Sequence, residues 1–509
     1  MDTKAKIDQR REEARKRQQA LKKRENSKFS PKLKSRLIGT GCTLLVIILI
    51  AALIFPNTGL SRRMLTALTI GDTDISVAEY SYYYRTSFNN YYQTMYSYFG
   101  GEYMPIDTTK SLDKQAYSED MTYADYFSSQ SIDSLKQLVV LSSEAKKAGF
   151  TLPAEQQASL DRTLSNVKTS AQNANTTVSN YLSTNFGMGF NMSILEKCVS
   201  RELLADAYKT EKENSFTYTD AELEAYYQEN HTQYDMADVR MVRFPVTEAT
   251  DTDPGVTAEE AKAQADAFLE GVTSEEDFAA KALEKAQAEA AEGVTAEDNS
   301  LITNLRYSTV ASTDVNVANW IFMINTQAGA SEVVEAADGN GYYAIYMIKA
   351  PARSDEKTVD IRHILISASD NGSEEGMAAA KAQAEEIYQQ FLSGGATEEL
   401  FAQLANEHTG DSGSAGNGGL YTGVYKGQMV QSFDDWCFDE ARFAGDSGII
   451  ESEYGYHIMY FVGDNLPRWQ IDVKADMASA DYNEWYTSVS EQYTVSEHPF
   501  AMKYRSEPF

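Results

Sequence analysis

The chain has only three cysteines among its 509 residues, too few for a disulfide scaffold. Cys198 and Cys437 lie far apart, in different predicted domains, which indicates that packing alone holds the folded chain together. No group of cysteine and histidine has the close spacing of a zinc site, so we predict no bound metal. A Gly-x-Ser-x-Gly element is also missing, which argues against a serine hydrolase.

Positive charge is scarce in most of the chain and concentrated at its beginning. Residues 1–36 hold fourteen Lys and Arg against five Asp and Glu, a net of +9, whereas the remainder has a net of −39. Such a basic arm is found in some nucleic-acid-binding proteins, but here an apolar run follows it directly. Residues 37–55 are nineteen positions without a charge, the length of a membrane-spanning helix. We therefore predict a membrane segment and no nucleic-acid partner.

The flanks of this apolar run predict its orientation. Lys and Arg clustered before it hold that side in the cytoplasm, and Arg62 and Arg63 on the far side are too few to reverse it. No Ala-x-Ala pattern follows Phe55, so we predict an uncleaved signal anchor, with a cleaved signal peptide as the alternative. Cys42 lies at the start of the run and not after it, which argues against a lipid-modified cysteine.

Residues 65–234 are predicted to form a mainly helical domain. A short hairpin turns at Gly71-Asp72, and Ser76-x-x-Glu79 is a capping box that begins a helix. Twelve tyrosines follow between Tyr80 and Tyr126, many at i, i+3 or i+4 spacing. They predict either a packed helical core or an aromatic surface that binds unfolded chains.

The chain contains an internal repeat, whose parts we call the first copy (residues 236–352) and the second copy (residues 357–466). Each copy has a first strand, a pair of Ala- and Glu-rich helices, a Trp-containing motif and a last strand. The matching segments are Asp238-Val-Arg-Met241 with Asp360-Ile-Arg-His363, Asn319-Trp-Ile-Phe322 with Asp435-Trp-Cys-Phe438, and Gly341-Tyr-Tyr343 with Gly455-Tyr-His457. Their offsets of 122, 116 and 114 residues indicate one fold with small insertions.

The two copies differ at a pair of histidines. His363 and His457 lie on the first and last strands of the second copy, where the first copy has Met241 and Tyr343. Two histidines facing each other across a sheet, beside a small apolar pocket, suit a reaction that transfers no atoms between molecules. Proline cis/trans isomerisation is such a reaction, and we expect it in the second copy, with a degenerate site in the first.

Four motifs of the second copy occur in a characteristic order. They are Arg-His-Ile-Leu, a Gly-Ser-Ala…Gly-Gly loop, Gly-Gln-Met-Val…Phe, and Gly-Tyr-His-Ile. With these motifs the second copy resembles the parvulin (rotamase) family of peptidyl-prolyl isomerases over essentially its full length. The whole layout is similar to that of the PrsA/SurA-type extracytoplasmic foldases, in which parvulin domains are joined to a helical chaperone domain. Most PrsA proteins have a lipid anchor, whereas a transmembrane helix is predicted here.

The resemblance implies an active site around the histidine pair His363 and His457. The family usually has a Cys or Asp facing the prolyl bond; a gapless count puts Ser412 there, or Asp411 if the loop shifts by one residue. Ser452 corresponds to the Ser or Thr that hydrogen-bonds the histidines. The implied proline pocket consists of Tyr421, Met429 and Phe433.

Two positions of the second copy depart from the family's pattern, and the first is Ser412, since serine is uncommon at the Cys or Asp position. Leu420 replaces the aspartate of the family's Gly-Gly-Asp-Leu-Gly loop. Isomerisation requires only a pocket that binds the twisted amide better than the planar one, so we expect neither a cofactor nor a metal.

Together these features predict an α+β protein. It has a cytoplasmic basic segment (1–36), a single transmembrane signal anchor (37–55), a helical chaperone-like domain (65–234) and two parvulin-like domains (236–352 and 357–466), each a small antiparallel sheet with surrounding helices and the first degenerate. Residues 467–509 are predicted to form a helix between Asp476 and Gln492 and a tail that returns to the helical domain.

The predicted function is that of a foldase anchored in a bacterial cell membrane, with its bulk outside the cytoplasm. It isomerises X-Pro bonds of unfolded or partly folded exported polypeptides. The alternative is a chaperone or scaffold that only binds clients, with both parvulin folds as peptide-holding modules.

Overall fold

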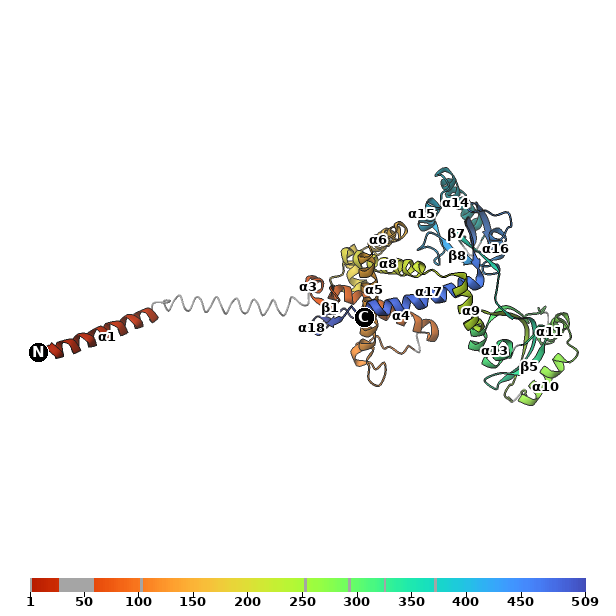
Figure 1. The fold of residues 1–509 in the computed structure, drawn as a ribbon, viewed down its shortest axis with the longest axis horizontal. Helices are drawn as coiled ribbons and strands as arrows, with labels where there is room; N and C mark the ends of the chain where they lie inside the picture. Colours follow the sequence, from red (N-terminus) through yellow and green to blue (C-terminus); the bar gives the residue numbers. More distant parts are fainter. Residues whose placement is uncertain are drawn as a thin grey trace. The chain divides into compact units, whose positions relative to one another are not determined.

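The computed structural model describes residues 2–26, 59–100, 104–250, 254–291, 294–324, 326–369 and 373–509 (Figure 1). The predicted membrane segment, 37–55, and Cys42 lie outside these residues. No helix within the described stretches has both the length and the apolar character needed to cross a membrane. Helix α1 (Asp2–Asn26) falls in the predicted basic segment, and its described side chains are exposed.

The chain divides into two compact units. Unit 1 comprises residues 1–150, 160–205 and 489–509, and unit 2 comprises residues 151–159 and 206–488. Unit 1 is therefore assembled from segments at both ends of the sequence, and unit 2 is inserted between them.

Unit 1 is mainly helical, with one small sheet. Its elements are α3 (Gly59–Met64), β1 (Thr66–Ile70), β2 (Thr73–Ser76), α4 (Val77–Phe99), η3 (Leu112–Lys114), α5 (Tyr123–Lys147), most of α6 (Ala154–Asn173), α7 (Val178–Phe186), the first part of α8 (Met192–Ser215), β11 (Val495–Glu497) and α18 (Pro499–Met502). The sheet has the order β11-β1-β2, so the strand near the end of the chain pairs with the strand near its beginning.

The start of α4 follows the sequence signal closely. The Ser76 side chain accepts a hydrogen bond from the Glu79 backbone N–H, and the Glu79 carboxylate accepts one from the Ser76 backbone N–H. These two bonds satisfy backbone donors that a helix leaves unpaired at its first turn.

The tyrosines of α4 have two different environments. In the first half of the helix Tyr80 and Tyr84 are fully buried, and Tyr84 packs edge-on against Phe127 in the core of unit 1. In the second half the side chains reach solvent, and Tyr98 is 76% exposed. The core-packing interpretation therefore holds for the first half, whereas the second half leaves aromatic side chains at the surface.

Unit 2 contains two four-stranded antiparallel sheets of the same topology. The first copy consists of β3 (Met236–Pro245), α10 (Ala258–Leu269), α11 (Glu275–Glu289), β4 (Leu301–Arg306), α12 (Tyr307–Thr313), α13 (Val315–Phe322), β5 (Ser331–Glu335) and β6 (Gly341–Ala352), with the sheet order β4-β3-β6-β5. The second copy consists of β7 (Lys357–Ser367), α14 (Glu374–Ser393), α15 (Glu398–His408), β8 (Leu420–Val424), α16 (Gln431–Cys437), β9 (Ser447–Ser452) and β10 (Gly455–Pro467), with the order β8-β7-β10-β9.

The two sheets also share their register. Met241 lies opposite Ile345 in the first copy as His363 lies opposite Met459 in the second, at the offsets of 122 and 114 residues found in the sequence. A slip of one residue would turn every side chain to the other face of the sheet. The equal register therefore places the matching positions of the two copies on equivalent faces.

Each copy has the same arginine contact between its first strand and its second helix, which we call the arginine tie. Arg240 on β3 contacts the carboxylate of Glu275, the first residue of α11, at 3.1 Å, and Arg362 on β7 contacts Glu398, the first residue of α15, at 3.0 Å. Arg362 also donates to the carbonyl oxygens of Asn417 and Gly418 at 2.9 and 3.0 Å. This tie fixes the second helix of the pair, and in the second copy the loop after it, on the sheet.

A second shared contact positions the strand at the edge of each sheet. Asp238 accepts a hydrogen bond from the Asn304 backbone N–H, and Asp360 accepts one from the Gly423 N–H. Asn304 and Gly423 both have positive φ, 55° and 63°, a conformation that Gly and Asn adopt more readily than other residues.

Helices α9 (Asp220–Tyr234) and α17 (Arg468–Ser490) complete unit 2. Tyr227 of α9 packs with Trp469 and Val473 of α17, so α9 contributes to the core of this unit. Helix α17 begins directly after Pro467, eight residues before the Asp476 expected from the sequence. Its first turn buries both a charged residue, Arg468, and an apolar one, Trp469, so polar and apolar positions do not separate there into the two faces by which a sequence pattern reveals a helix.

Candidate functional site

Strands β7 and β10 bring the two histidines into contact. His363 and His457 lie on the same face of the sheet as diagonal neighbours, since His363 pairs with Met459, two residues after His457. Their Nδ1 atoms are 3.1 Å apart, and the rings stack with centroids at 5.4 Å. Each histidine is only 5% exposed, so this contact lies away from bulk water.

The loop after α15 supplies a carboxylate, that of Asp411, at the His363 end of the site. The Oδ2 atom of Asp411 lies 3.0 Å from the Nε2 atom of His363 and accepts hydrogen bonds from the hydroxyls of Tyr421 (3.0 Å) and Ser414 (2.5 Å). The Ser414 backbone N–H also donates to this carboxylate at 3.1 Å. The loop is therefore folded around Asp411, and the carboxylate faces the histidine pair.

The opposite end of the pair is held by Ser452. Its Oγ atom lies 2.7 Å from the Nε2 atom of His457 and accepts a hydrogen bond from the Tyr454 backbone N–H at 3.2 Å. The polar groups thus form one continuous series of hydrogen bonds from Ser452 through His457 and His363 to Asp411, which we call the hydrogen-bonded chain.

The charges along this chain follow from the contacts. The hydrogen bond from His363 is the largest of several that hold the pKa of Asp411 far below its usual range, so the carboxylate is ionised at neutral pH. Burial, followed by the neighbouring His363, lowers the pKa of His457 to about 4. Burial and the hydrogen bond to Asp411 raise the pKa of Tyr421 to about 12.

The ionised carboxylate fixes the proton position at the end of this series of hydrogen bonds. Asp411 can only accept, so the His363 Nε2 atom carries a hydrogen. One hydrogen lies between the two Nδ1 atoms, and the Ser452 hydroxyl donates to or accepts from His457 Nε2 according to the tautomer of that ring. Every polar atom of this chain has a partner in that arrangement, which makes the site rigid.

Aromatic side chains form the apolar wall beside the histidines. The Phe433 ring, supplied by α16, meets both histidine rings edge-on at centroid distances of 5.4 and 5.8 Å. The Tyr421 ring, supplied by β8, lies 5.4 Å from that of His363. Met429 is half-buried against the same apolar cluster. Rings and a thioether beside a polar chain form a surface that suits a prolyl ring.

The structure brings together most of the residues that the sequence analysis names. His363, His457, Ser452, Tyr421 and Phe433 form one connected set of contacts around the histidine pair, with Met429 in the adjoining cluster.

Ser412 is the exception among the predicted site residues. It is exposed, and no hydrogen bond of the described residues involves its hydroxyl, whereas its neighbour Asp411, the alternative, contacts His363. Ser414, which was not among the predicted site residues, is fully buried and bridges Asp411 and His363. An Asp with a Ser three residues later is the pattern of a turn closed by side-chain hydrogen bonds, and this signal was available in the sequence.

The first copy has Met241 and Tyr343 at the positions equivalent to His363 and His457, and within the described part of the chain these two residues form no comparable series of hydrogen bonds. Met241 packs with the apolar cluster on α13, and the guanidinium of Arg243 lies 5.8 Å from the ring centre of Tyr343. Neither Met241 nor Tyr343 can reproduce a pair of imidazole hydrogen bonds.

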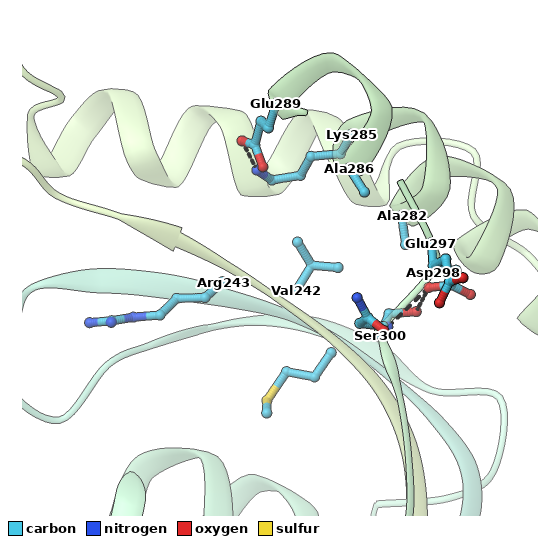
Figure 2. Close-up of a pocket in the computed structure, with 11 residues that line it drawn as sticks. Val242, Arg243, Ala282, Lys285, Ala286, Glu289, Glu297, Asp298 and Ser300 are labelled. Atoms are coloured by element: carbon cyan, nitrogen blue, oxygen red, sulfur yellow. Dashed lines mark hydrogen bonds and ion pairs between the residues drawn. The ribbon is translucent and has the colours of Figure 1, made fainter. Parts of the chain in front are cut away.

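A cavity of about 210 Å³ lies beside Met241 (Figure 2). It is bordered by β3, α11 and residues 297–300. Its charged lining is largely paired: Lys285 bonds Glu289, and Asp298 bonds both Arg240 and Ser300. No group of His, Cys, Asp and Glu within the described residues could hold a metal ion.

Comparison with known proteins agrees with this geometry. A sequence model of the PPIC-type PPIase domain matches residues 343–463, which include both histidines and Asp411. The second copy is a parvulin-type domain. We call residues 357–466 the parvulin domain from here on.

Curated relatives extend the similarity to foldases and chaperones. The foldase protein PrsA 1 of Listeria innocua is 27% identical over 156 residues, which is 31% of this chain and 48% of the relative. The chaperone SurA of Chromohalobacter salexigens is 37% identical over 100 residues, 19% of this chain and 21% of the relative. The chain thus spans less than half the length of these relatives.

A solved structure of PrsA from Bacillus subtilis covers 59% of this chain and 83% of its own, at 16% identity and a TM-score of 0.19. With so low a TM-score this likeness supports no conclusion.

Proposed function

We propose that the chain is a foldase whose parvulin domain catalyses cis/trans isomerisation of X-Pro bonds in exported polypeptides. The observation that carries this proposal is the hydrogen-bonded chain from Ser452 through the histidine pair to Asp411, beside the ring of Phe433. The similarity of the domain to the PPIC-type family supports the same activity.

The proposed mechanism stabilises the twisted amide. Rotation about the X-Pro bond has a barrier of about 18–20 kcal/mol because resonance keeps the amide planar. In the planar form electron density moves from nitrogen to the carbonyl oxygen, and in the twisted form it returns to nitrogen. A carboxylate near that oxygen therefore disfavours the planar form more than the twisted one.

Each part of the site has a role in this mechanism. Phe433, Tyr421 and Met429 bind the prolyl ring and exclude water, while Asp411 supplies the fixed negative charge beside the carbonyl. The histidine pair and Ser452 hold Asp411 and the pocket in place. A rate gain of about 10³ requires only about 4 kcal/mol, the contribution of one well-placed charge in a site that excludes water.

A protease-coupled peptide isomerisation assay on the purified chain tests the proposal. We expect catalysis that His457→Ala abolishes and His408→Ala leaves unchanged, since His408 is a partly exposed residue at the end of α15, outside the hydrogen-bonded chain. A range of residues before proline should be scanned in the peptide. Failure of the folded chain to speed any X-Pro peptide would refute isomerase activity.

The second candidate function is client binding without catalysis. The first copy favours it, because it retains the sheet order, the register and the arginine tie while Met241 and Tyr343 replace the histidines. A fold maintained without its chemistry suits a module that holds peptides. If His363→Ala and His457→Ala leave the refolding yield of a client unchanged, binding is the function that clients depend on.

We also propose that residues 37–55 anchor the protein in a bacterial membrane, with residues 1–36 in the cytoplasm. The support is the uncharged length of this segment and the basic flank before it. Retention in the membrane pellet after carbonate extraction is the expected result. Protease added to spheroplasts should digest residues 59–509 and leave residues 1–36 protected.

A further inference from the structure

Residues 505–509 lie on a face of unit 1, and the side chains of that face make most of the contacts with them. We call this the α4 face and define it by Ser81, Tyr84, Arg85 and Phe88 of α4 and Gly187 at the end of α7. Residues 505–509, Arg-Ser-Glu-Pro-Phe, lie on it without regular secondary structure. Within the described residues, no backbone–backbone hydrogen bond holds positions 506–509.

The α4 face binds the main chain of this segment. The Ser506 backbone N–H donates to the Ser81 Oγ atom at 2.9 Å, and the Ser81 hydroxyl itself donates to a carbonyl of its own helix. The Arg85 guanidinium donates to two successive carbonyl oxygens, those of Glu507 (2.5 Å) and Pro508 (3.3 Å). The side chains of the face therefore bind a backbone group of each of three successive residues, and any polypeptide supplies such groups.

Two side chains of the segment add selectivity. The Phe509 ring packs on that of Phe88 at a centroid distance of 5.5 Å, and the Arg505 guanidinium lies 4.7 Å from the centre of the Tyr84 ring. At Pro508 only the carbonyl is used, so a residue without a backbone N–H fits there. The preferred sequence therefore places an aromatic residue directly after a proline.

Gly187 makes room for this segment. A Cβ atom at this position would lie 2.2 Å from the Ser506 Oγ atom, and the residue has a positive φ of 102°. Any side chain at 187 would collide with the bound segment, so the segment and the end of α7 fit each other closely.

We propose that the α4 face is a binding site for irregular, proline-containing polypeptide segments with an aromatic residue, and that residues 505–509 occupy it as an internal ligand. The segment is tethered to its site and therefore has a high effective concentration there. A client segment binds only when residues 505–509 have left the face. Its apparent affinity is therefore the intrinsic affinity multiplied by the fraction of time that the face is free. The proposal does not depend on isomerase activity.

The direct test uses a labelled, amidated peptide, Arg-Ser-Glu-Pro-Phe, and the full chain with residues 506–509 deleted. The deletion leaves β11 and α18 in place, and a cooperative unfolding transition checks that unit 1 is folded. By fluorescence anisotropy we expect the peptide to bind the deleted chain about tenfold or more tightly than the intact chain.

Substitutions on the face then locate the binding. In the deleted chain, Arg85→Gln should weaken binding of the peptide about tenfold or more, since it removes the donors to two carbonyls. Arg63→Gln, at an exposed position of α3, serves as the matched control and should leave the affinity unchanged. Equal affinity of the intact and deleted chains, or no loss with Arg85→Gln, would overturn the proposal.

A second variant covers the case in which the deletion unfolds unit 1. In the intact chain, Phe509→Ala removes the contact with Phe88 but keeps every backbone hydrogen bond of the segment. The internal ligand is then weaker, and the added peptide should bind several-fold more tightly than to the unchanged chain. The absence of any gain in this folded variant would equally overturn the proposal.

Discussion

Replacing Asp411 by asparagine should slow peptide isomerisation far more than replacing Ser412 by alanine. The two residues are neighbours in one loop, and the sequence offers both for the position that faces the prolyl bond. The structure distinguishes them, because the Asp411 carboxylate contacts the histidine pair and Ser412 is exposed.

The magnitude follows from the hydrogen bonds at Asp411. The carboxylate accepts from His363 at 3.0 Å, from Tyr421 at 3.0 Å and from Ser414 at 2.5 Å. A hydrogen bond to a charged group contributes about 1.5–3 kcal/mol and a neutral one about 0.5–1.5 kcal/mol. Because the Asp411 side chain is only partly buried before a substrate covers it, we expect Asp411→Asn to cost about 2 kcal/mol of transition-state stabilisation, roughly 30-fold in kcat/KM.

The assay is protease-coupled isomerisation with a fixed X-Pro peptide, and unfolding curves check that each variant folds. Ser412→Ala should change kcat/KM by less than about twofold, as expected for an exposed side chain without a partner. Asp439→Asn, an exposed carboxylate elsewhere in the parvulin domain, is the matched control for loss of charge. A larger loss for Ser412→Ala than for Asp411→Asn would show that the loop presents the serine to the substrate, and the proposed role of Asp411 would be wrong.

Three further predictions concern stability and the separation of fold from chemistry. The pKa of His457 is lowered to about 4 from an ordinary 6.5, so its contribution to stability is complete above pH 6.5 and is lost as the pH falls toward 4, by about 3 kcal/mol. The urea concentration at which half of the activity is lost should show this dependence on pH. In His457→Gln the dependence should be weaker. Arg362→Ala should lower the free energy of unfolding by about 3 kcal/mol, because it leaves a carboxylate and two carbonyls without their donor; urea unfolding measures this, and a change below about 1 kcal/mol would contradict it. The double variant His363→Met with His457→Tyr should keep the circular dichroism spectrum and lose isomerase activity, since the first copy has these residues in the same register.

The sequence predicted the repeat well because strand register is encoded locally. The offsets of 122 and 114 residues were read from short motifs, and the same offsets relate the paired strands of the two sheets. Alternation along a strand determines which face a residue occupies, so His363 and His457 were expected together.

Other parts of the site depend on contacts that a linear pattern does not contain. A gapless count predicted Ser412, with Asp411 as the alternative, and side-chain hydrogen bonds within the loop turn the Asp411 carboxylate toward His363. The hydroxyl of Tyr421, expected only as part of an apolar pocket, also holds that carboxylate. The contacts of residues 505–509 with α4 join positions more than 400 residues apart, and no local signal announces them.

The pairing of β11 with β1 has a consequence for how the protein matures. Leu68 lies opposite Glu497, so the sheet of unit 1 cannot be completed until synthesis has passed residue 497. Each sheet of unit 2 is built from one continuous stretch of sequence, and such local contacts form sooner. We therefore expect the parvulin domain to fold on the emerging chain while unit 1 is still open. During its own biogenesis the protein would have a competent isomerase before its helical unit closes, and nascent chains arrested before β11 should already show that activity.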